Sequence, residues 1–465
     1  CHGPASLHVE WAEMPEMARP PDPAYGLVIA TGTQSPQEQV ALCAPCHSRR
    51  AELGDYDHRS AVLMDNVVPR PLREGLYHAD GQILEEVYVW GSFVQSKMYA
   101  NDIRCADCHD VHSLERHAEG NALCAQCHRP DTYDSPDHHF HEAAEDGEPN
   151  PGAQCVNCHM VQKPFMVRDW RADHSLRVPR PDLTREIGTP NACSEAGCHA
   201  DRSLDWVLGY YEAWYGAARR PHYGQVFAWA REGRPDAGPM LMEMATDPLY
   251  PSIVRATALE YLTAFPSDSA TEVFRSALQD EDPLIRFTAL ASAGAGSPEQ
   301  YVELVSPLLF DPVKAVRTET ASRLAGAPIQ MLQPYQREQF DLALGEYESA
   351  QRHALDFAAA AHNLGNLHAA RGDAFQAEYY YREALLIDDL FTPAKTNLAV
   401  ILNSQGRNDE AERLLTQVLE TDPDNFEVAY SMGLLLAEMG RIDEATEFLG
   451  QAAAGLPARA RIQYN

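Results

Sequence analysis

CADCHDVHSLERHAEGNALCAQCH, residues 105–128, contains two complete Cys-x-x-Cys-His motifs in one short segment. In such a motif two thiols can form thioether bonds to the vinyl groups of one porphyrin, and the adjacent histidine is then held beneath the ring as an iron ligand. A single copy is also compatible with half of a zinc site or with a redox-active dithiol. Recurrence of the motif along the chain favours covalently attached c-type haem.

The same pattern extends outward on both sides of this segment. Complete motifs occupy residues 43–47 (CAPCH) and 155–159 (CVNCH), and residues 193–199 (CSEAGCH) form a variant with four intervening residues. Cys1 and His2 resemble the end of a sixth motif, so we expect the natural chain to begin upstream of this numbering; the alternative is a free N-terminal thiol. The predicted haem-attachment cysteines are Cys1, Cys43, Cys46, Cys105, Cys108, Cys124, Cys127, Cys155, Cys158, Cys193 and Cys198.

Two other uses of these cysteines have to be weighed against haem. A disulfide framework would pair the cysteines, but it does not place a histidine after every second one. Zinc sites also use Cys-x-x-Cys pairs. Four Cys-x-x-Cys-His copies within about 120 residues favour haem over zinc.

The histidines of this region divide into two sets of predicted axial ligands. Each motif histidine supplies one ligand, and this proximal set is His2, His47, His109, His128, His159 and His199. The distal candidates are His8, His78, His112, His138, His139, His141 and His174. A second protein ligand leaves an iron that only passes electrons, whereas an open position can bind a small substrate. We expect His112 to ligate an iron other than that of His109.

Other potential ligands are interpreted as structural. His58, His117 and His222 are predicted to be surface or structural residues. Met160 directly follows a motif, which leaves it too close to reach the opposite face of its own haem, so packing is the favoured role.

The net charge and the hydropathy of the chain restrict the classes of binding partner. The 37 Lys and Arg residues against 68 Asp and Glu residues give a net charge of −31, which disfavours nucleic acid and anionic membrane surfaces and favours a redox partner with a basic face. No stretch approaches the roughly 18 apolar residues of a membrane span. Covalent haem attachment in c-type cytochromes implies assembly outside the cytoplasm, so we expect a periplasmic or extracellular protein.

Changes in sequence texture predict three domains. Residues 1–202 are rich in Pro, Gly, His and Asp and show little helical or strand periodicity, as expected where porphyrins supply the apolar core. Amphipathic helices begin at Ser203, a predicted N-cap, and their aromatic residues are interpreted mainly as helix-packing core. Helical repeats are predicted over residues 203–330 and 331–465.

Two different repeat periods indicate two kinds of helical repeat. Arg255, Arg286 and Arg317 recur every 31 residues after Asp-Pro pairs, a pattern that resembles HEAT repeats. A period of 34 follows, and its small residues resemble those of tetratricopeptide repeats. The positions that recur are Gly365, Ala399 and Gly433, and Gly372, Gly406 and Gly440.

The tetratricopeptide segment also carries a partial ligand-binding pattern. Asn366 and Asn397 resemble two members of a carboxylate clamp, but Glu427 and Ser431 stand where that clamp has cations, so a free C-terminal carboxylate is disfavoured as ligand. A purely structural solenoid or a self-association surface is the alternative to peptide docking. Because a further repeat has begun by Asn465, we expect the natural chain to continue.

Several stretches together resemble a known family. CHGPASLH, CAPCHSRR, GLYHADGQILEEVYVWGSFVQSKMY, CADCHDVH, HHFH, CVNCHM and RADHSLRVPRPDL, followed by the two repeat regions, are similar to bacterial multihaem cytochromes fused to helical repeats. The resemblance spans nearly the whole chain. It implies further motifs upstream and a haem arrangement similar to octahaem cytochromes related to hydroxylamine oxidoreductase.

These observations predict a mostly α protein that acts as an electron-transfer multihaem cytochrome c, with about six haems in this chain and a helical-repeat docking region. The chain has no Cys-x-x-Cys-Lys motif of the kind that pentahaem nitrite reductases use, which favours a carrier over an enzyme. One alternative is an octahaem-type oxidoreductase for a small nitrogen or sulfur compound, with its active haem upstream of Cys1. Another is a haem-wiring subunit of a filament or complex.

Overall fold

The computed structural model describes residues 3–56, 62–145, 148–194, 198–292, 297–456 and 461–462. The predicted ligands Cys1 and His2, as well as His58, lie outside the described residues. The chain forms two compact units: Cys1–Ala51 with Tyr56–Ala295 and Pro312–Val316, and Glu52–Asp55 with Gly296–Asp311 and Arg317–Asn465. The three predicted domains stay a prediction.

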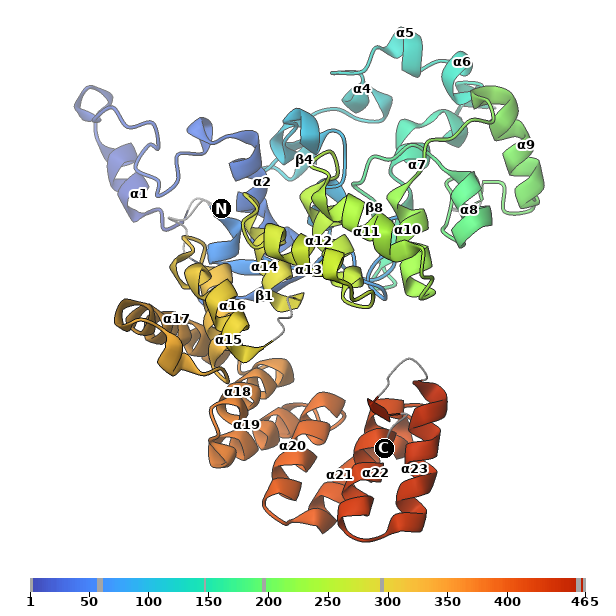
Figure 1. Cartoon of the computed structure of the whole chain (residues 1–465). Coiled ribbons are helices and arrows are strands. Elements are labelled where there is room, and N and C mark those ends of the chain that lie inside the picture. The colour runs from blue at the N-terminus through green and yellow to red at the C-terminus, as the bar shows by residue number, and fades with distance from the viewer. Residues whose placement is uncertain are drawn as a thin grey trace. The chain divides into compact units, whose positions relative to one another are not determined.

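The first part of unit 1 is built from short elements joined by long connections (Figure 1). Its helices are α1 (Ser6–Glu13), α2 (Pro36–His47), α3 (Trp90–Phe93), α4 (Asn121–Cys124), α5 (Pro130–Tyr133), α6 (Pro136–His139), α7 (Cys155–His159) and α8 (Pro181–Ile187). Its strands are β1 (Arg50–Glu52), β2 (Val67–Pro69), β3 (His109–Asp110), β4 (Glu115–Arg116), β5 (Ala144–Glu145), β6 (Glu148–Pro149), β7 (Gln162–Phe165) and β8 (Asp169–Ala172). The strands pair only with their neighbours, as four two-stranded sheets. This agrees with the small amount of regular structure predicted for the motif region.

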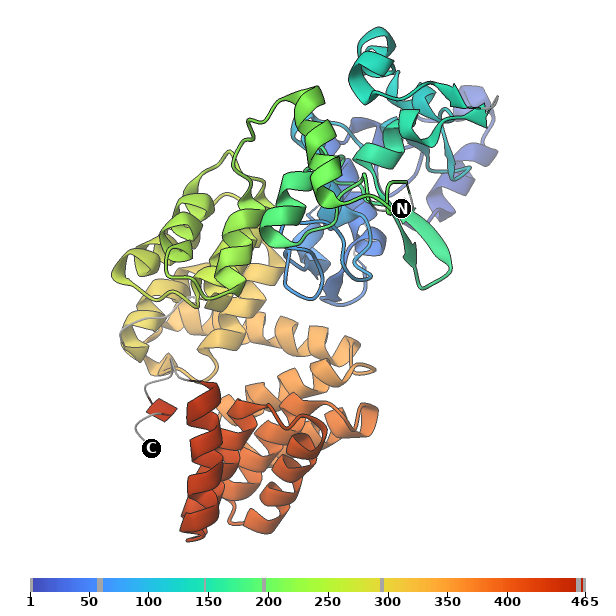
Figure 2. The same ribbon diagram turned by 90° about the vertical axis from the view of Figure 1, so that its right-hand side faces the viewer.

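Longer helices complete unit 1: α9 (Leu204–Tyr215), α10 (Tyr223–Arg231), α11 (Ala237–Thr246), α12 (Ser252–Leu262), α13 (Asp268–Ala277) and α14 (Pro283–Ser292). The predicted N-cap Ser203 accepts a hydrogen bond from the Trp206 N–H at 3.2 Å. The helices from α10 onward pack side by side (Figure 2). Leu259 and Leu262 of α12 are fully buried, and the motif region also buries apolar side chains, such as Leu72 and Val87.

The motif region is joined to these helices by polar contacts, one of them buried and one exposed. The Leu72 N–H donates to Thr257 Oγ1 at 2.9 Å, and the Arg73 guanidinium contacts the Glu260 carboxylate at 3.0 Å. Both acceptors lie on α12, which therefore supports the segment that precedes α3.

Unit 2 continues the helical repeats. Its helices are α15 (Pro298–Val305), most of α16 (Lys314–Leu324), α17 (Pro334–His353), α18 (Ala358–Ala370), α19 (Ala374–Ile387), α20 (Thr392–Ser404), α21 (Asn408–Thr421), α22 (Phe426–Glu438) and α23 (Ile442–Gly455). From α18 onward they form antiparallel pairs, α18 with α19, α20 with α21 and α22 with α23 (Figure 1). The predicted helical solenoid is thus present.

The glycines that recur every 34 residues have the structural roles that this repeat period predicts. Gly372, Gly406 and Gly440 have φ of 78°, 75° and 78°, a conformation that L side chains rarely adopt and that ends the first helix of each pair. Gly365 lies where two helices approach closely: a Cβ there would meet Tyr381 Cε1 at 2.4 Å. Glycine is therefore required for packing at this position.

Replacing Gly365 by alanine should destabilise unit 2 by about 1–3 kcal/mol, because the added methyl overpacks the contact with Tyr381. The matched control is Gly345→Ala in α17, where a Cβ has no atom within 4 Å. That variant should be neutral or gain up to about 1 kcal/mol from helix propensity. Urea unfolding curves of both variants decide the point, and equal effects would contradict it.

Within the described residues, no helix is both long and apolar enough to cross a membrane.

Candidate functional site

The Cys-x-x-Cys-His motifs lie on short helices and turns of unit 1. Residues 43–47 end α2, whose start is fixed by a capping box between Ser35 and Glu38. Residues 155–159 form α7, and Asn121 at the start of α4 ties this helix to the preceding motif: Asn121 Oδ1 accepts from the Cys155 N–H at 2.9 Å. All ten described cysteines are free thiols.

Thiols of successive motifs are neighbours. The Cys43 thiol hydrogen-bonds the Cys105 sulfur, which raises the pKa of Cys43 and lowers the pKa of Cys105. In the same way the hydrogen bond with Cys155 lowers the pKa of Cys124 to about 7. Cys158 in turn lies near Cys198. The motifs therefore follow one another through the fold largely in chain order.

Three of the motif histidines face a second imidazole contributed by another segment. The ring centroids are 6.4 Å apart for His109 and His174, with the rings inclined by 27°. They are 6.2 Å apart for His159 and His138, inclined by 7°. They are also 6.2 Å apart for His199 and His141, inclined by 29°. Each pair joins one predicted proximal and one predicted distal ligand.

This spacing fits a shared metal ion and also fits a simple aromatic contact. Imidazole–metal bonds are about 2 Å long, and the nitrogen lies roughly 1 Å from the ring centre, so two imidazoles on opposite sides of one ion have centroids about 6 Å apart. Simple aromatic contacts cover about 4.5–7 Å. The spacing alone therefore does not distinguish metal ligation from an aromatic contact. The position of the proton on each ring is the additional observation.

In every pair, one imidazole donates its Nδ1–H to a main-chain carbonyl. His174 donates to Ala172 at 2.9 Å, His159 to Arg177 at 2.8 Å and His141 to His139 at 2.5 Å. A carbonyl oxygen can only accept, so the proton of the neutral ring is on Nδ1 and the lone pair is on Nε2. This is the arrangement that orients a metal-ligating histidine.

Two other distal candidates bond elsewhere. His8 donates from Nδ1 to the Tyr25 carbonyl at 2.6 Å, which leaves its Nε2 lone pair available. His78 accepts from Lys163 Nζ at its Nε2, at 3.3 Å. Burial, reinforced by the Lys163 charge, lowers the pKa of His78 to about 4. His78 is thus a neutral, half-buried ring whose Nε2 is engaged.

Three further histidines of the region are placed as follows. His112 is exposed, with Nδ1 4.0 Å from Asp110 Oδ1, and its predicted role as ligand of a second iron stays a prediction. His139 accepts the His141 N–H at Nδ1, at 3.3 Å, so its neutral ring carries the proton on Nε2. His117 donates from Nε2 to a main-chain carbonyl at 2.9 Å. Neither of the last two rings presents a free Nε2 lone pair.

Helix α9 presents aromatic rings to the last imidazole pair. The Trp206 ring is 5.0 Å from His199, and the Trp214 ring is 6.2 Å from His141. The sequence favoured a packing role for these aromatics, but in α9 it is Tyr211 that is buried, whereas Tyr210 remains 47% exposed. Trp206, Tyr210 and Trp214 recur at a spacing of four residues, and this spacing is the sequence signal for an aromatic face of α9 beside the imidazoles.

Within the described part of the chain, no group of three or more His, Cys, Asp and Glu side chains is arranged to hold a metal ion. Each imidazole pair offers two protein ligands.

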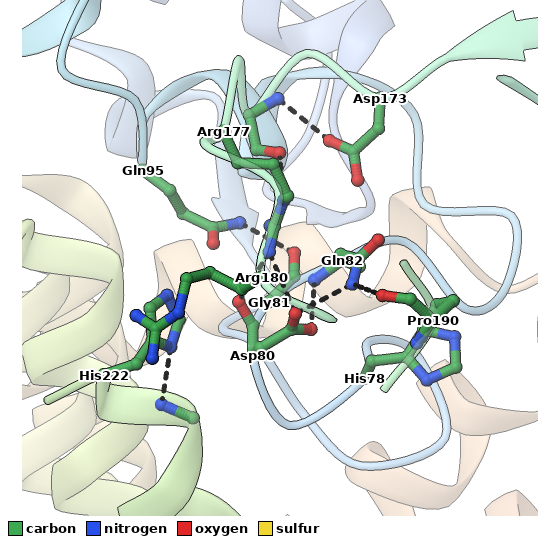
Figure 3. Close-up of polar contacts among 12 residues, drawn as sticks. His78, Asp80, Gly81, Gln82, Gln95, Asp173, Arg177, Arg180, Pro190 and His222 are labelled. Carbon is green, nitrogen blue, oxygen red and sulfur yellow. Dashed lines mark hydrogen bonds and ion pairs between the residues drawn. The ribbon is translucent and has the colours of Figure 1, made fainter. Parts of the chain in front are cut away.

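A buried polar cluster adjoins the motifs and was not predicted (Figure 3). Asp80 is 2% exposed, and its carboxylate accepts from Arg177 at 3.1 Å and from the Gln82 side chain at 2.8 Å. Asp173 is also buried and accepts the Ser175 N–H at 2.8 Å. Asp80 and Arg177 are 97 positions apart in the chain, so no local sequence pattern indicates that they pair.

His222 provides the N-cap of α10 beside this cluster, with Nδ1 accepting the Gly224 N–H at 3.0 Å. Burial lowers the pKa of His222 to about 4; the Asp80 carboxylate opposes this shift, and the Arg177 guanidinium adds to it. The unfolded ring titrates near pH 6.5. Stability that depends on neutral His222 is therefore complete above about pH 6.5 and is lost as the pH falls toward 4.

We predict that His222→Asn reduces the acid sensitivity of unit 1, because asparagine keeps the cap but does not titrate. Between about pH 7.5 and pH 5 the variant should lose roughly 2 kcal/mol less unfolding free energy than the natural chain. Urea unfolding at the two pH values measures the difference. An identical loss in both proteins would contradict the assignment.

In unit 2 the residues that resemble a carboxylate clamp are already bonded to each other. Asn397 Nδ2 donates to Asn366 Oδ1 at 2.8 Å and lies 3.0 Å from His362 Nε2. The Tyr381 hydroxyl also donates to Asn366 Oδ1 at 2.8 Å. The two amides thus form a hydrogen bond between neighbouring repeats.

Comparison with protein families identifies both repeat regions. The model for HEAT repeats matches residues 238–325, and models for tetratricopeptide repeats match residues 357–387 and 402–464. Both predicted repeat types are confirmed. An uncharacterized protein of Sinorhizobium fredii (strain NBRC 101917 / NGR234), y4yS, is 34% identical over 136 residues, which are 27% of this chain and 72% of the relative. This chain belongs to the y4yS family.

Solved structures with similarity to this y4yS-family chain include repeat proteins. MamA is 16% identical, with a TM-score of 0.24 over 37% of this chain and 90% of its own. YrrB, a tetratricopeptide protein with an unusual peptide-binding site, is 20% identical, with a TM-score of 0.26 over 42% and 98%. The Cut9–Hcn1 assembly is 14% identical, with a TM-score of 0.30 over 62% and 58%. The repeat assignment rests on the family models rather than on these similarities.

Proposed function

We propose that unit 1 binds c-type haem at its Cys-x-x-Cys-His motifs and transfers electrons, and that the HEAT and tetratricopeptide repeats dock a protein partner. One observation carries the haem proposal: three motif histidines each face a second imidazole at 6.2–6.4 Å. In each pair a main-chain carbonyl fixes the proton on the Nδ1 of one ring. These are six residues that the motif spacing alone does not bring together.

The residues fit the group. Haem would provide four nitrogen donors of its own, so the two imidazoles of a pair could complete the ligand set without a third side chain. The free thiols next to each pair provide the two attachment points per motif. When bound, haem supplies a one-electron redox couple.

The chain's own residues would then set the order of the haem sites and the orientation of their histidine ligands. Carbonyls of the 172–177 segment and of His139 hold the imidazole rings at Nδ1, which would leave Nε2 as the atom that binds a metal. The contacts Cys43–Cys105 and Cys124–Cys155 favour a path that follows the chain order of the motifs. Two imidazole ligands at each of these three sites would leave no position for a substrate, which would favour electron transfer over substrate turnover.

Optical spectra of the purified full chain test the proposal. We expect a Soret band and, after reduction with dithionite, the sharp visible bands of low-spin haem. Stoichiometric zinc without a Soret band would overturn it in favour of the zinc interpretation. Added nitrite or hydroxylamine should leave the spectrum of these three sites unchanged, and a shift there would favour the oxidoreductase alternative.

The docking part of the proposal rests on the confirmed repeats and on charge. Stacked helix pairs provide extended surfaces for protein partners. A net charge of −31 should attract a partner with a basic face.

Electron transfer to a basic single-haem cytochrome should therefore slow steeply as salt is raised. Screening shortens the reach of surface charges to about 10 Å at 0.1 M salt. Stopped-flow rates measured between low and high salt test this, with an acidic acceptor of similar potential as the control. Equal rates for both acceptors at low salt would contradict electrostatic steering.

A further inference from the structure

We infer that the buried ion pair between Asp80 and Arg177 positions two iron sites at once, because it anchors the single segment, residues 172–177 (ADHSLR), that serves both. The inference rests on the proposed haem function. It makes Arg177 a positioning residue, which acts through its main chain on one ligand and through its segment on another.

The segment contributes to two different imidazole pairs. His174 faces His109 at 6.4 Å between ring centroids and takes its orientation from the Ala172 carbonyl. Three residues later, Arg177 exchanges two hydrogen bonds with His159: the Arg177 N–H donates to the His159 carbonyl at 3.2 Å, and His159 Nδ1 donates to the Arg177 carbonyl at 2.8 Å. Movement of this segment would displace a ligand in both pairs.

The side chain of Arg177 fixes the segment to the protein. Its guanidinium donates to Asp80 Oδ2 at 3.1 Å and to the Asp80 carbonyl at 3.2 Å. Its Nε donates to Ser175 Oγ at 2.8 Å, a hydrogen bond between two side chains of the same segment. The side chains of Asp80 and Arg177 are only 2% and 18% exposed. Removal of either charge would leave the other buried without a partner, which is strongly unfavourable.

Asp80 is itself held firmly. Gln82 donates to its carboxylate from both the main chain, at 3.2 Å, and the side chain, at 2.8 Å. The Tyr223 hydroxyl of α10 donates to the Asp80 carbonyl at 2.8 Å. A Cβ on Gly224 would lie 2.6 Å from Asp80 Cα, so α10 packs directly against this residue. Figure 3 shows Arg177 and Gln82 converging on Asp80, with His222 of α10 beside them.

The other end of the segment has its own buried anchor. Asp173 accepts the Ser175 N–H at 2.8 Å and the Ile83 N–H at 3.2 Å. Between the anchors, Leu176 has φ of 48°, a conformation that costs energy for a residue other than glycine and persists where the surroundings impose it. The segment is therefore held in one shape from both sides.

The test compares Arg177→Gln with the natural haem-loaded full chain by EPR and by redox titration. Signals are assigned beforehand with His174→Ala, His138→Ala and His141→Ala, each of which removes one distal ligand. We expect Arg177→Gln to broaden or shift the low-spin signals and midpoint potentials of the His109 and His159 sites together. The His199 site should be unchanged. Arg177→Lys, which keeps the charge, should restore part of the natural spectrum.

A matched control separates positioning from general stability. Arg255 and Asp280 form an ion pair of similar burial in unit 1, with exposures of 14% and 17%, and it contacts none of the imidazole pairs. Arg255→Gln should lower the melting temperature yet leave all three signals in place. If Arg177→Gln does not fold, Ser175→Ala removes only the bond to Arg177 Nε and should produce a smaller shift at the same two sites.

The outcomes are distinguishable. A change at one site alone, at none, or equally in the Arg255→Gln control would overturn the positioning role while leaving the haem function intact. A natural chain that carries no haem would instead remove the proposed function itself.

Discussion

Replacing His138 by alanine is expected to convert the iron site of His159 from low-spin to high-spin. The two rings face each other at 6.2 Å and are inclined by only 7°. The Nδ1–H of His159 is fixed by the Arg177 carbonyl, so His159 should stay in place when its partner is removed. The open position should then bind added imidazole or cyanide, which EPR and optical titration both detect.

His139→Ala is the matched control, because the two histidines are adjacent in α6. His139 accepts the His141 N–H at Nδ1, and the proton on its Nε2 excludes iron binding by the neutral ring. This variant should keep every low-spin signal. High-spin iron in His139→Ala together with an unchanged His138→Ala spectrum would show that the pairing is wrong.

Replacing both Cys155 and Cys158 by alanine should remove one covalently bound haem from the chain. The two thiols are the attachment points of the motif, and His159 alone would leave the group free to dissociate on denaturation. The number of haem c groups per chain, measured as the pyridine haemochrome after denaturation, should fall by one. The other sites should keep their haem, because each has its own pair of attachment cysteines.

The control for this variant is Met160→Leu, which preserves volume beside the same motif. Met160 is interpreted as a packing residue, so its replacement should change neither the haem number nor the potential of the His159 site. A full haem count in the double cysteine variant, or a large change in potential in Met160→Leu, would contradict the assignment of this site.

The repeats could be predicted because their determining contacts are local and periodic. Gly365 faces Tyr381 within one helix pair, and the same relation recurs every 34 residues, so the small residue is visible in the sequence. The helix-ending Gly372 and its equivalents are equally regular. Fold and sequence agree here because nearest-neighbour packing dominates in repeat proteins.

The motif region could be predicted only in part. The cysteines and the histidines next to them form a local pattern, but a distal ligand is chosen by the path of the chain. His174 lies 65 positions after His109 (174 − 109), and nothing in the sequence between them specifies that they meet. The predicted distal set therefore includes the three histidines that face a motif histidine, but the sequence did not give these pairings, and their role as iron ligands stays a prediction.

The polar cluster was not predicted for the same reason. Asp80 and Arg177 are far apart in the sequence, and burial of a charge is visible only once its partner is known. The α9 aromatics, by contrast, carried a signal in their spacing. Trp206 and Trp214 lie eight positions apart on one helix face (214 − 206), and that face meets the imidazoles of His199 and His141.

The central claim is that the motifs hold haem covalently, and the haem content of the denatured, extracted chain tests it most directly. Pyridine haemochrome measured against quantitative amino-acid analysis should give about six haem c groups per chain. The haem should stay with the polypeptide after acid–acetone extraction. A chain that retains no haem after extraction, or that carries zinc in its place, would contradict the account.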